Sequence, residues 1–181
     1  MLSSYAKTLL SQVGAGTPMG DFMRKFWVPA MRAESLEAGG APLRLRLLGE
    51  DMVAFRGDDG RVGVLDERCP HRGVSLTLAR NADCALTCIF HGWKIDAEGK
   101  VLDTPCEPAH TREAFAKTIK TRAFPAREGG GMIWVYLGKQ ATPPRFPEFD
   151  VKLLPDSHVL ARRAITHYNY LQGIEAHIDA S

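Results

Sequence analysis

Two short segments of the chain combine residue types that bind transition metals. Residues 69–73 read Cys-Pro-His-Arg-Gly and residues 88–93 read Cys-Ile-Phe-His-Gly-Trp, with sixteen residues between the first histidine and the second cysteine. Each segment pairs a soft thiolate with an imidazole, ligands typical of zinc and iron–sulfur centres. Both segments contain glycine or proline, which predicts loops from which a rigid scaffold can direct ligands toward one point. The candidate ligands are Cys69, His71, Cys88 and His91.

Two kinds of metal centre use two cysteines and two histidines. Ligand pairs of structural zinc sites are usually separated by at least two residues, whereas only Pro70 lies between Cys69 and His71. A binuclear cluster relaxes this limit, because the two members of a pair can bind different irons. In Rieske centres one iron takes two cysteines and the other takes two histidines. The spacing therefore favours a Rieske-type [2Fe–2S] cluster, with a zinc site as the alternative.

Short strands separated by turns predict an antiparallel β domain that carries the two loops. Gly-Asp-Asp-Gly at residues 57–60 and Asp-Ala-Glu-Gly at residues 96–99 predict hairpin turns. Leucines alternate with arginines over residues 43–47, as in a half-buried strand. The other runs that read as strands are residues 52–55, 61–65, 94–95, 100–102, 119–124 and 132–137.

The two ends of the chain are expected to contain helices. Thr17 followed by Pro18 is a favourable helix start. The apolar residues that follow at helical spacing are expected in the core: Met19, Phe22, Met23 and Phe26. Residues 159–166 read as a strand and residues 169–181 as a helix. The polar residues that share one face of this last helix are Asn169, Gln172, Glu175 and Asp179.

The composition is that of an ordinary globular protein. The 181 residues are 45% hydrophobic and 24% charged, with a formal net charge of +2, so the chain can bury its own core. Basic residues are scattered, which predicts no nucleic-acid and no membrane partner. No targeting segment or membrane-spanning run is evident, and we expect a cytoplasmic protein. Cys84 and Cys106, outside the two motifs, are expected to be buried or half-buried thiols.

The paired motifs resemble the Rieske domain of non-haem iron aromatic ring-hydroxylating oxygenases, in particular the oxygenase (alpha) subunit of the phthalate dioxygenase type. The resemblance covers essentially the whole chain and implies a mainly β fold, an antiparallel Rieske [2Fe–2S] β-sandwich. Respiratory Rieske proteins are similar but add a disulfide between the loops, at positions occupied here by Val74 and Phe90. The oxygenase type is therefore implied. Further stretches that carry the resemblance are residues 14–20, 46–51, 65–73 and 90–94.

The resemblance also implies an activity for a longer protein. The cluster would accept electrons from an NAD(P)H-dependent flavin or ferredoxin reductase and pass them to a mononuclear Fe(II). This iron would activate O2 on an aromatic substrate, by resemblance an aromatic carboxylate, as in aromatic hydrocarbon catabolism. Asp179 matches the residue that bridges a cluster histidine of one subunit to an iron ligand of its neighbour, and the resemblance also implies a homotrimer in the full-length form. The iron ligands would follow Ser181, so this chain alone is expected to lack the catalytic iron.

Four parts are predicted along the chain: an N-terminal helical segment (1–37), a Rieske [2Fe–2S] domain (38–140), a proline-rich linker (141–158) and the first strand and helix of an incomplete α+β catalytic domain (159–181). A freestanding Rieske ferredoxin, which carries electrons without a catalytic iron, is the alternative function. The first and last parts argue against it, since a simple carrier needs neither.

Overall fold

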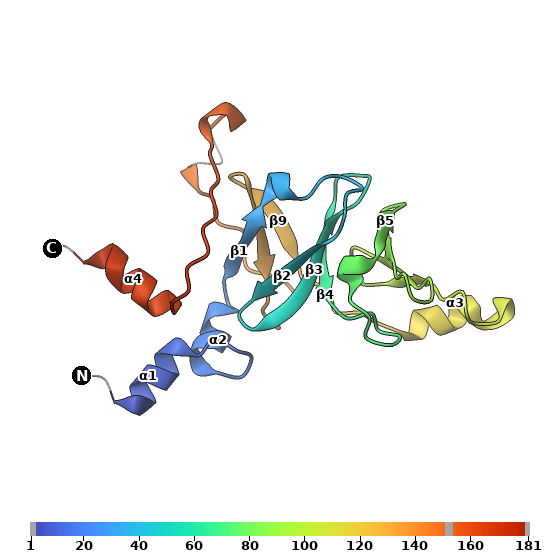
Figure 1. Cartoon of the computed structure of the whole chain (residues 1–181), viewed down its shortest axis with the longest axis horizontal. Helices are drawn as coiled ribbons and strands as arrows, with labels where there is room; N and C mark the ends of the chain where they lie inside the picture. The colour runs from blue at the N-terminus through green and yellow to red at the C-terminus, as the bar shows by residue number, and fades with distance from the viewer. Residues whose placement is uncertain (1–2, 151–153, 180–181) are drawn as a thin grey trace.

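The computed structural model describes residues 3–150 and 154–179. Figure 1 shows an elongated molecule whose middle and right half are built from antiparallel sheets. In the described ranges the strand orders are β1-β10-β9, β2-β3-β4 and β5-β6-β7-β8. The helices and strands are α1 (Ser4–Ser11), α2 (Pro18–Met23), β1 (Trp27–Arg32), η1 (Ala33–Ser35), β2 (Leu43–Leu47), β3 (Glu50–Arg56), β4 (Val62–Asp66), η2 (Leu76–Leu78), β5 (Arg80–Ala82), β6 (Ala85–Thr87), β7 (Lys94–Asp96), β8 (Val101–Asp103), α3 (Ala109–Thr118), β9 (Ala126–Gly129), β10 (Met132–Tyr136), η4 (Asp156–His158) and α4 (Tyr170–Ile178). Among them, no helix is long and apolar enough to cross a membrane.

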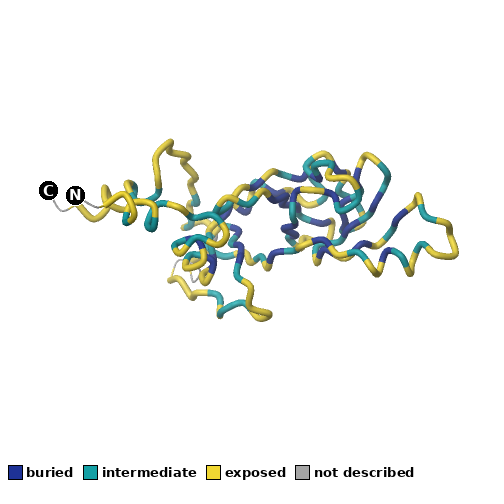
Figure 2. Tube along the Cα trace, turned by 90° about the horizontal axis from the view of Figure 1, so that it is seen from below, coloured by how far each residue is buried: buried dark blue, intermediate teal, exposed yellow. Residues whose placement is uncertain are grey.

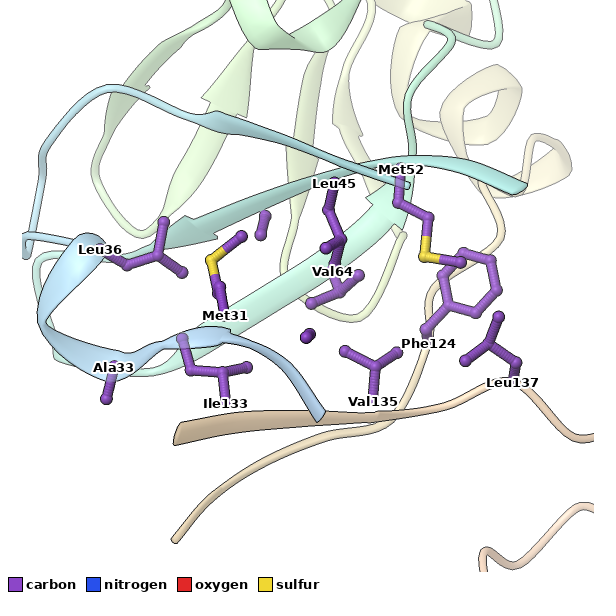
Figure 3. Packing of buried hydrophobic residues seen from close by; sticks show 12 residues of the cluster. Met31, Ala33, Leu36, Leu45, Met52, Val64, Phe124, Ile133, Val135 and Leu137 are labelled. Atoms are coloured by element: carbon purple, nitrogen blue, oxygen red, sulfur yellow. The ribbon is translucent and has the colours of Figure 1, made fainter. Parts of the chain in front are cut away.

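The sheets β1-β10-β9 and β2-β3-β4 pack face to face around one hydrophobic core. Figure 3 shows side chains from the two sheets pointing toward one another. The alternation predicted for β2 is confirmed, because Leu45 is buried while Arg44 and Arg46 are exposed. The expected antiparallel β-sandwich is therefore confirmed.

Strand β3 is buried on both of its faces. Met52 and Ala54 belong to the sandwich core, whereas Val53 and Phe55 belong to a second core. Successive side chains of a strand point to opposite faces, so one strand serves both cores. The second core lies beneath the β5–β8 sheet and α3, and Figure 2 shows the buried residues concentrated between the two exposed ends of the molecule.

The helical segment predicted for residues 1–37 is wrong in its second half. Helices α1 and α2 are present, but residues 27–32 form strand β1, which pairs antiparallel with β10 from Trp27 opposite Tyr136 to Arg32 opposite Met132. The prediction failed because the partner strand lies about a hundred residues further along the chain.

The core position predicted for the apolar residues after Pro18 is also wrong. Phe22 and Phe26 are 52% and 53% exposed, and their rings pack edge to face on each other with centroids 5.2 Å apart. Met19 and Met23 are half-buried. Besides Gly20, the fold buries a charged residue of this segment, Arg24.

Arg24 fixes α2 to β3. Its Nε and Nη2 donate to Oε1 of Glu50 at 3.1 and 2.8 Å, and its Nη1 donates to the carbonyls of Val13 and Gly20. The other carboxylate oxygen of Glu50 accepts from Arg122. Burial raises the pKa of Glu50, but the hydrogen bonds from the two arginines outweigh it and hold this pKa below its usual value.

Two of the predicted strands are absent from the described residues. Residues 119–124 make isolated bridges at Lys120, to Lys100, and at Ala123, to Leu65, so this segment crosses between sheets rather than extending one. Residues 159–166 have no regular secondary structure. A strand needs a partner for its backbone hydrogen bonds, and no described strand pairs with this segment.

The last helix is confirmed over its described residues. Asn169 and Gln172 form a capping box at the start of α4. The amide of Asn169 donates to the carbonyl of Ser11 at 3.1 Å, and the hydroxyl of Tyr170 donates to the carbonyl of Leu10. These bonds hold α4 beside α1, at the left of Figure 1.

Candidate metal centre

The two candidate loops, loop one (residues 69–73) and loop two (residues 88–92), have the same pattern of backbone hydrogen bonds. The N–H of Cys69 donates to the carbonyl of Val74, and the N–H of Gly73 donates back to the carbonyl of Cys69, both at 2.9 Å. The second loop repeats this pattern from its own cysteine: Cys88 to Trp93 at 2.9 Å and Gly92 to Cys88 at 3.0 Å. Both glycines have a left-handed backbone, with φ of 71° and 72°, a conformation that strongly favours glycine. The histidine comes two residues after the cysteine in the first loop and three after it in the second.

The two loops lie side by side and bring all four candidate ligands together. Loop one follows β4 and loop two directly follows β6. Cys69 and Cys88 are 3% and 4% exposed, and the Cys88 thiol lies close enough to raise the pKa of Cys69. The half-buried rings of His71 and His91 lie with their centroids 4.7 Å apart. The site is therefore a buried thiol pair beside an imidazole pair nearer the surface.

The donor set fits a [2Fe–2S] cluster. Burial and the neighbouring Cys88 thiol raise the pKa of Cys69 to about 11, so a thiolate here needs a compensating positive charge, which a bound metal supplies. Nδ1 of His91 is buried without a hydrogen-bond partner, and metal ligation would satisfy such a nitrogen. No three described histidine, cysteine or acidic side chains surround one point as ligands of a single ion.

The ring of Trp93 packs against the imidazole of His71. The two rings are stacked, with centroids 4.7 Å apart and an interplanar angle of 8°. Burial, the nearby His91 and the charge of Arg72 lower the pKa of His71. These surroundings favour a neutral imidazole, which is the form that binds metals.

A buried carboxylate that sequence reasoning missed supports loop one. Glu67 is 3% exposed. It accepts hydrogen bonds from the hydroxyl of Ser75 at 2.6 Å and from Nη2 of Arg44 at 2.7 Å. Burial raises the pKa of Glu67, but these two bonds outweigh it and lower this pKa overall. The sequence signal that could have pointed to Glu67 is its position at the end of a strand, two residues before the first candidate ligand.

Glu67→Gln should lower the free energy of unfolding by roughly 1.5–3 kcal/mol, the range for hydrogen bonds to a charged group. The amide keeps the shape of the side chain but removes the buried charge that Arg44 and Ser75 stabilise. Urea titrations followed by circular dichroism measure this change. Glu98→Gln is the matched control, because Glu98 pairs with Arg61 at an exposed site. Equal stabilities of the two variants would contradict the role of Glu67.

The remaining predicted residues lie away from this centre or at its rim. Cys84 is half-buried, as expected, but Cys106 is exposed, which corrects the expectation of a sheltered thiol. Its Sγ lies 3.9 Å from the carbonyl oxygen of His91, since it sits on the loop beside loop two. The described cysteines form no disulfide. Asp179 follows α4, at the end of the molecule opposite the β5–β8 sheet (Figure 1).

Comparison with known proteins identifies the family. Residues 26–125, more than half of the chain, match the Rieske [2Fe–2S] domain. The chain is 45% identical over 172 residues to the 3-chlorobenzoate-3,4-dioxygenase oxygenase subunit of Comamonas testosteroni. It is 41% identical over 184 residues to the phthalate 4,5-dioxygenase oxygenase subunit of Pseudomonas putida. These alignments cover 95% and 100% of this chain but 39% and 41% of the relatives, so the chain spans about two fifths of their length.

Solved structures agree with this assignment. Apo dicamba monooxygenase matches with a TM-score of 0.65 and 28% identity, over 75% of this chain and 41% of that one. The reduced complex between oxygenase and ferredoxin in carbazole 1,9a-dioxygenase matches with a TM-score of 0.60 and 30% identity, over 77% of this chain and 33% of that one. The chain therefore belongs to the Rieske [2Fe–2S] domain family, and over nearly its whole length it is similar to oxygenase subunits.

Proposed function

We propose that this chain is the electron-transfer part of a ring-hydroxylating or demethylating oxygenase. In this proposal Cys69 and Cys88 hold one iron of a [2Fe–2S] cluster, and His71 and His91 hold the other. The observation that supports this proposal is the pair of loops with the same backbone hydrogen-bond pattern. Together they bring two thiols and two imidazoles to one end of the fold.

Each side chain has a distinct task in this proposal. When bound, the cluster supplies reversible one-electron chemistry at a potential raised by its neutral histidine ligands. The buried cysteines exclude water from one side of the centre, while the half-buried histidines lie closer to solvent. Electrons would therefore arrive through the histidine side.

The surface beside the histidines suits a redox partner. Ile89 and Phe90, next to His91 in loop two, are 62% and 55% exposed, and Arg72 of loop one is exposed as well. An apolar patch with a charged rim is typical of a protein-binding surface. We propose an NAD(P)H-dependent flavin or ferredoxin reductase as the electron donor. The complex of a similar oxygenase with a ferredoxin supports this class of partner.

The destination of the electron lies outside this chain in our proposal. The matched relatives are more than twice as long and are named for reactions of chlorobenzoate and phthalate. We propose that the full-length protein binds a mononuclear Fe(II), activates O2 on an aromatic substrate, an aromatic carboxylate by analogy, and works in the cytoplasm. Because α4 and the cluster loops lie at opposite ends (Figure 1), Asp179 would serve the cluster of a neighbouring subunit, as in a homotrimer.

The purified chain tests the first part of this proposal. We expect two irons and two sulfides per chain, and a reduced state that gives a Rieske-type EPR spectrum. The midpoint potential should lie above about −150 mV, compared with roughly −400 mV for a plant-type all-cysteine cluster. Zinc without iron and sulfide would overturn the proposal, and a potential near the all-cysteine value would overturn the histidine ligation.

A further inference from the structure

The three tryptophans of the chain differ in what their indole N–H groups bind. Nε1 of Trp27 donates to the carbonyl of Pro144 at 2.9 Å, and Nε1 of Trp134 donates to the carbonyl of Gly129 at 3.0 Å. Nε1 of Trp93 is buried and has no acceptor among the described residues. A buried donor without an acceptor destabilises the folded protein, so this N–H requires an acceptor that the described residues do not provide.

The surroundings of Trp93 narrow the nature of that acceptor. The residue is 4% exposed and belongs to the same buried core as Cys69 and Cys88. Its ring stacks on His71, and its backbone carbonyl accepts the N–H of Cys88. An indole nitrogen donates and cannot accept or bind a cation. The missing partner is therefore an acceptor next to the candidate ligands.

Nδ1 of His91 differs from the Trp93 N–H, because its missing partner can be a metal ion. Nδ1 of His91 is also buried without a partner, but an imidazole nitrogen can bind a metal. Two buried nitrogens beside the same loops thus lack partners, one suited to iron and one suited to an anion. A [2Fe–2S] cluster offers both, because its sulfides and cysteine thiolates are anionic sulfurs.

We propose that the Trp93 N–H donates a hydrogen bond to an anionic sulfur of the cluster. This inference rests on the cluster of the proposed function. Trp93 is then a positioning residue with two effects: its ring holds the orientation of His71, and its N–H stabilises the additional negative charge of the reduced state. Hydrogen bonds to the sulfurs are among the factors that set the reduction potential of such clusters. Trp93 therefore makes the cluster easier to reduce.

Trp93→Phe tests the N–H separately from the stacking, because phenylalanine keeps an aromatic ring against His71. Variants are compared at equal iron and sulfide content. At the wild-type midpoint potential, the ratio of reduced to oxidised protein should fall about tenfold, which equals about 59 mV for one electron. An unchanged ratio in a variant that retains its cluster would overturn the proposal.

Two matched variants separate this effect from general loss of packing. Trp134→Phe removes an indole N–H that already has a backbone acceptor, and its ratio should stay at the wild-type value. Phe115→Leu removes the ring packed edge-on against Trp93, at 6.1 Å between centroids, and should also leave the ratio unchanged. A tenfold fall in either control would assign the effect to packing and overturn the proposal.

A measurement on the wild-type protein decides the case if Trp93→Phe fails to assemble its cluster. Protein labelled with 15N in the tryptophan indole is reduced and studied by pulsed EPR. We expect a coupling from one indole nitrogen to the cluster, and the absence of coupling would overturn the inference. A wild-type protein without iron and sulfide would instead refute the proposed function, so the two failures are distinguishable.

Discussion

Asp179→Asn in the full-length protein should lower the rate of substrate oxygenation by about 10–100-fold, the usual range for residues that support metal ligands. The [2Fe–2S] cluster should keep its iron content, EPR spectrum and midpoint potential. The substitution keeps the shape of the side chain but removes the charge that would bind the histidines of two metal sites. Steady-state turnover and single-turnover reduction of the catalytic iron measure the effect.

Glu175→Gln provides the control for this experiment. Glu175 lies one turn earlier on α4, is exposed like Asp179, and accepts the backbone N–H of Asp179 through its own backbone carbonyl. Its substitution removes the same charge from the same helix and should leave turnover unchanged. Full activity of Asp179→Asn, or equal losses in both variants, would refute the bridging role.

Arg24→Met should lower the free energy of unfolding by roughly 3–5 kcal/mol, the range for removing one partner of a buried ion pair. Methionine fills part of the volume but leaves the half-buried carboxylate of Glu50 to be balanced by Arg122 alone. The carbonyls of Val13, Gly20 and Leu48 also lose their donor. Urea denaturation followed by circular dichroism gives the two free energies.

The dependence on pH distinguishes this ion pair from simple packing. The folded-state pKa of Glu50 lies below its usual value, so its contribution is complete above the unfolded pKa, about 4.3. The contribution is lost as the pH falls through the lower folded pKa. The stability gap between wild type and Arg24→Met should therefore narrow in acid. Arg46→Met, which breaks the exposed pair with Asp51, should cost about 0.2–1 kcal/mol, and a comparable loss in both variants would contradict the anchoring role of Arg24.

The four candidate ligands could be singled out from the sequence because their pattern is local. Each cysteine and histidine pair lies within four consecutive residues, and the left-handed glycine that closes each loop lies in the same segment. Hairpins with short turns were predictable for the same reason, as β3 and β4 show around residues 57–60. Local patterns report the conformation of a segment and the chemistry it can carry.

Features that depend on distant partners could not be predicted. Trp27 reads as the end of a helical segment until Tyr136 is placed opposite it. Nothing near Arg24 in the sequence indicates that it is buried, and only the fold brings Glu50 beside it. Likewise, nothing near Glu67 in the sequence indicates that Arg44 would cover it. The physical reason is that burial is a property of the assembled sheets, which a single segment does not encode.

Strand β3 has a consequence for how this fold can be divided. Its alternate side chains fill two cores, one shared with β10 and the other with the cysteines of the two loops. The half that carries the two loops therefore depends on β3 of the sandwich to complete its hydrophobic core. We expect that this half would not fold if it were transplanted without the sandwich. The smallest unit that can be exchanged between proteins is therefore the pair of cores together, in evolution as in engineering.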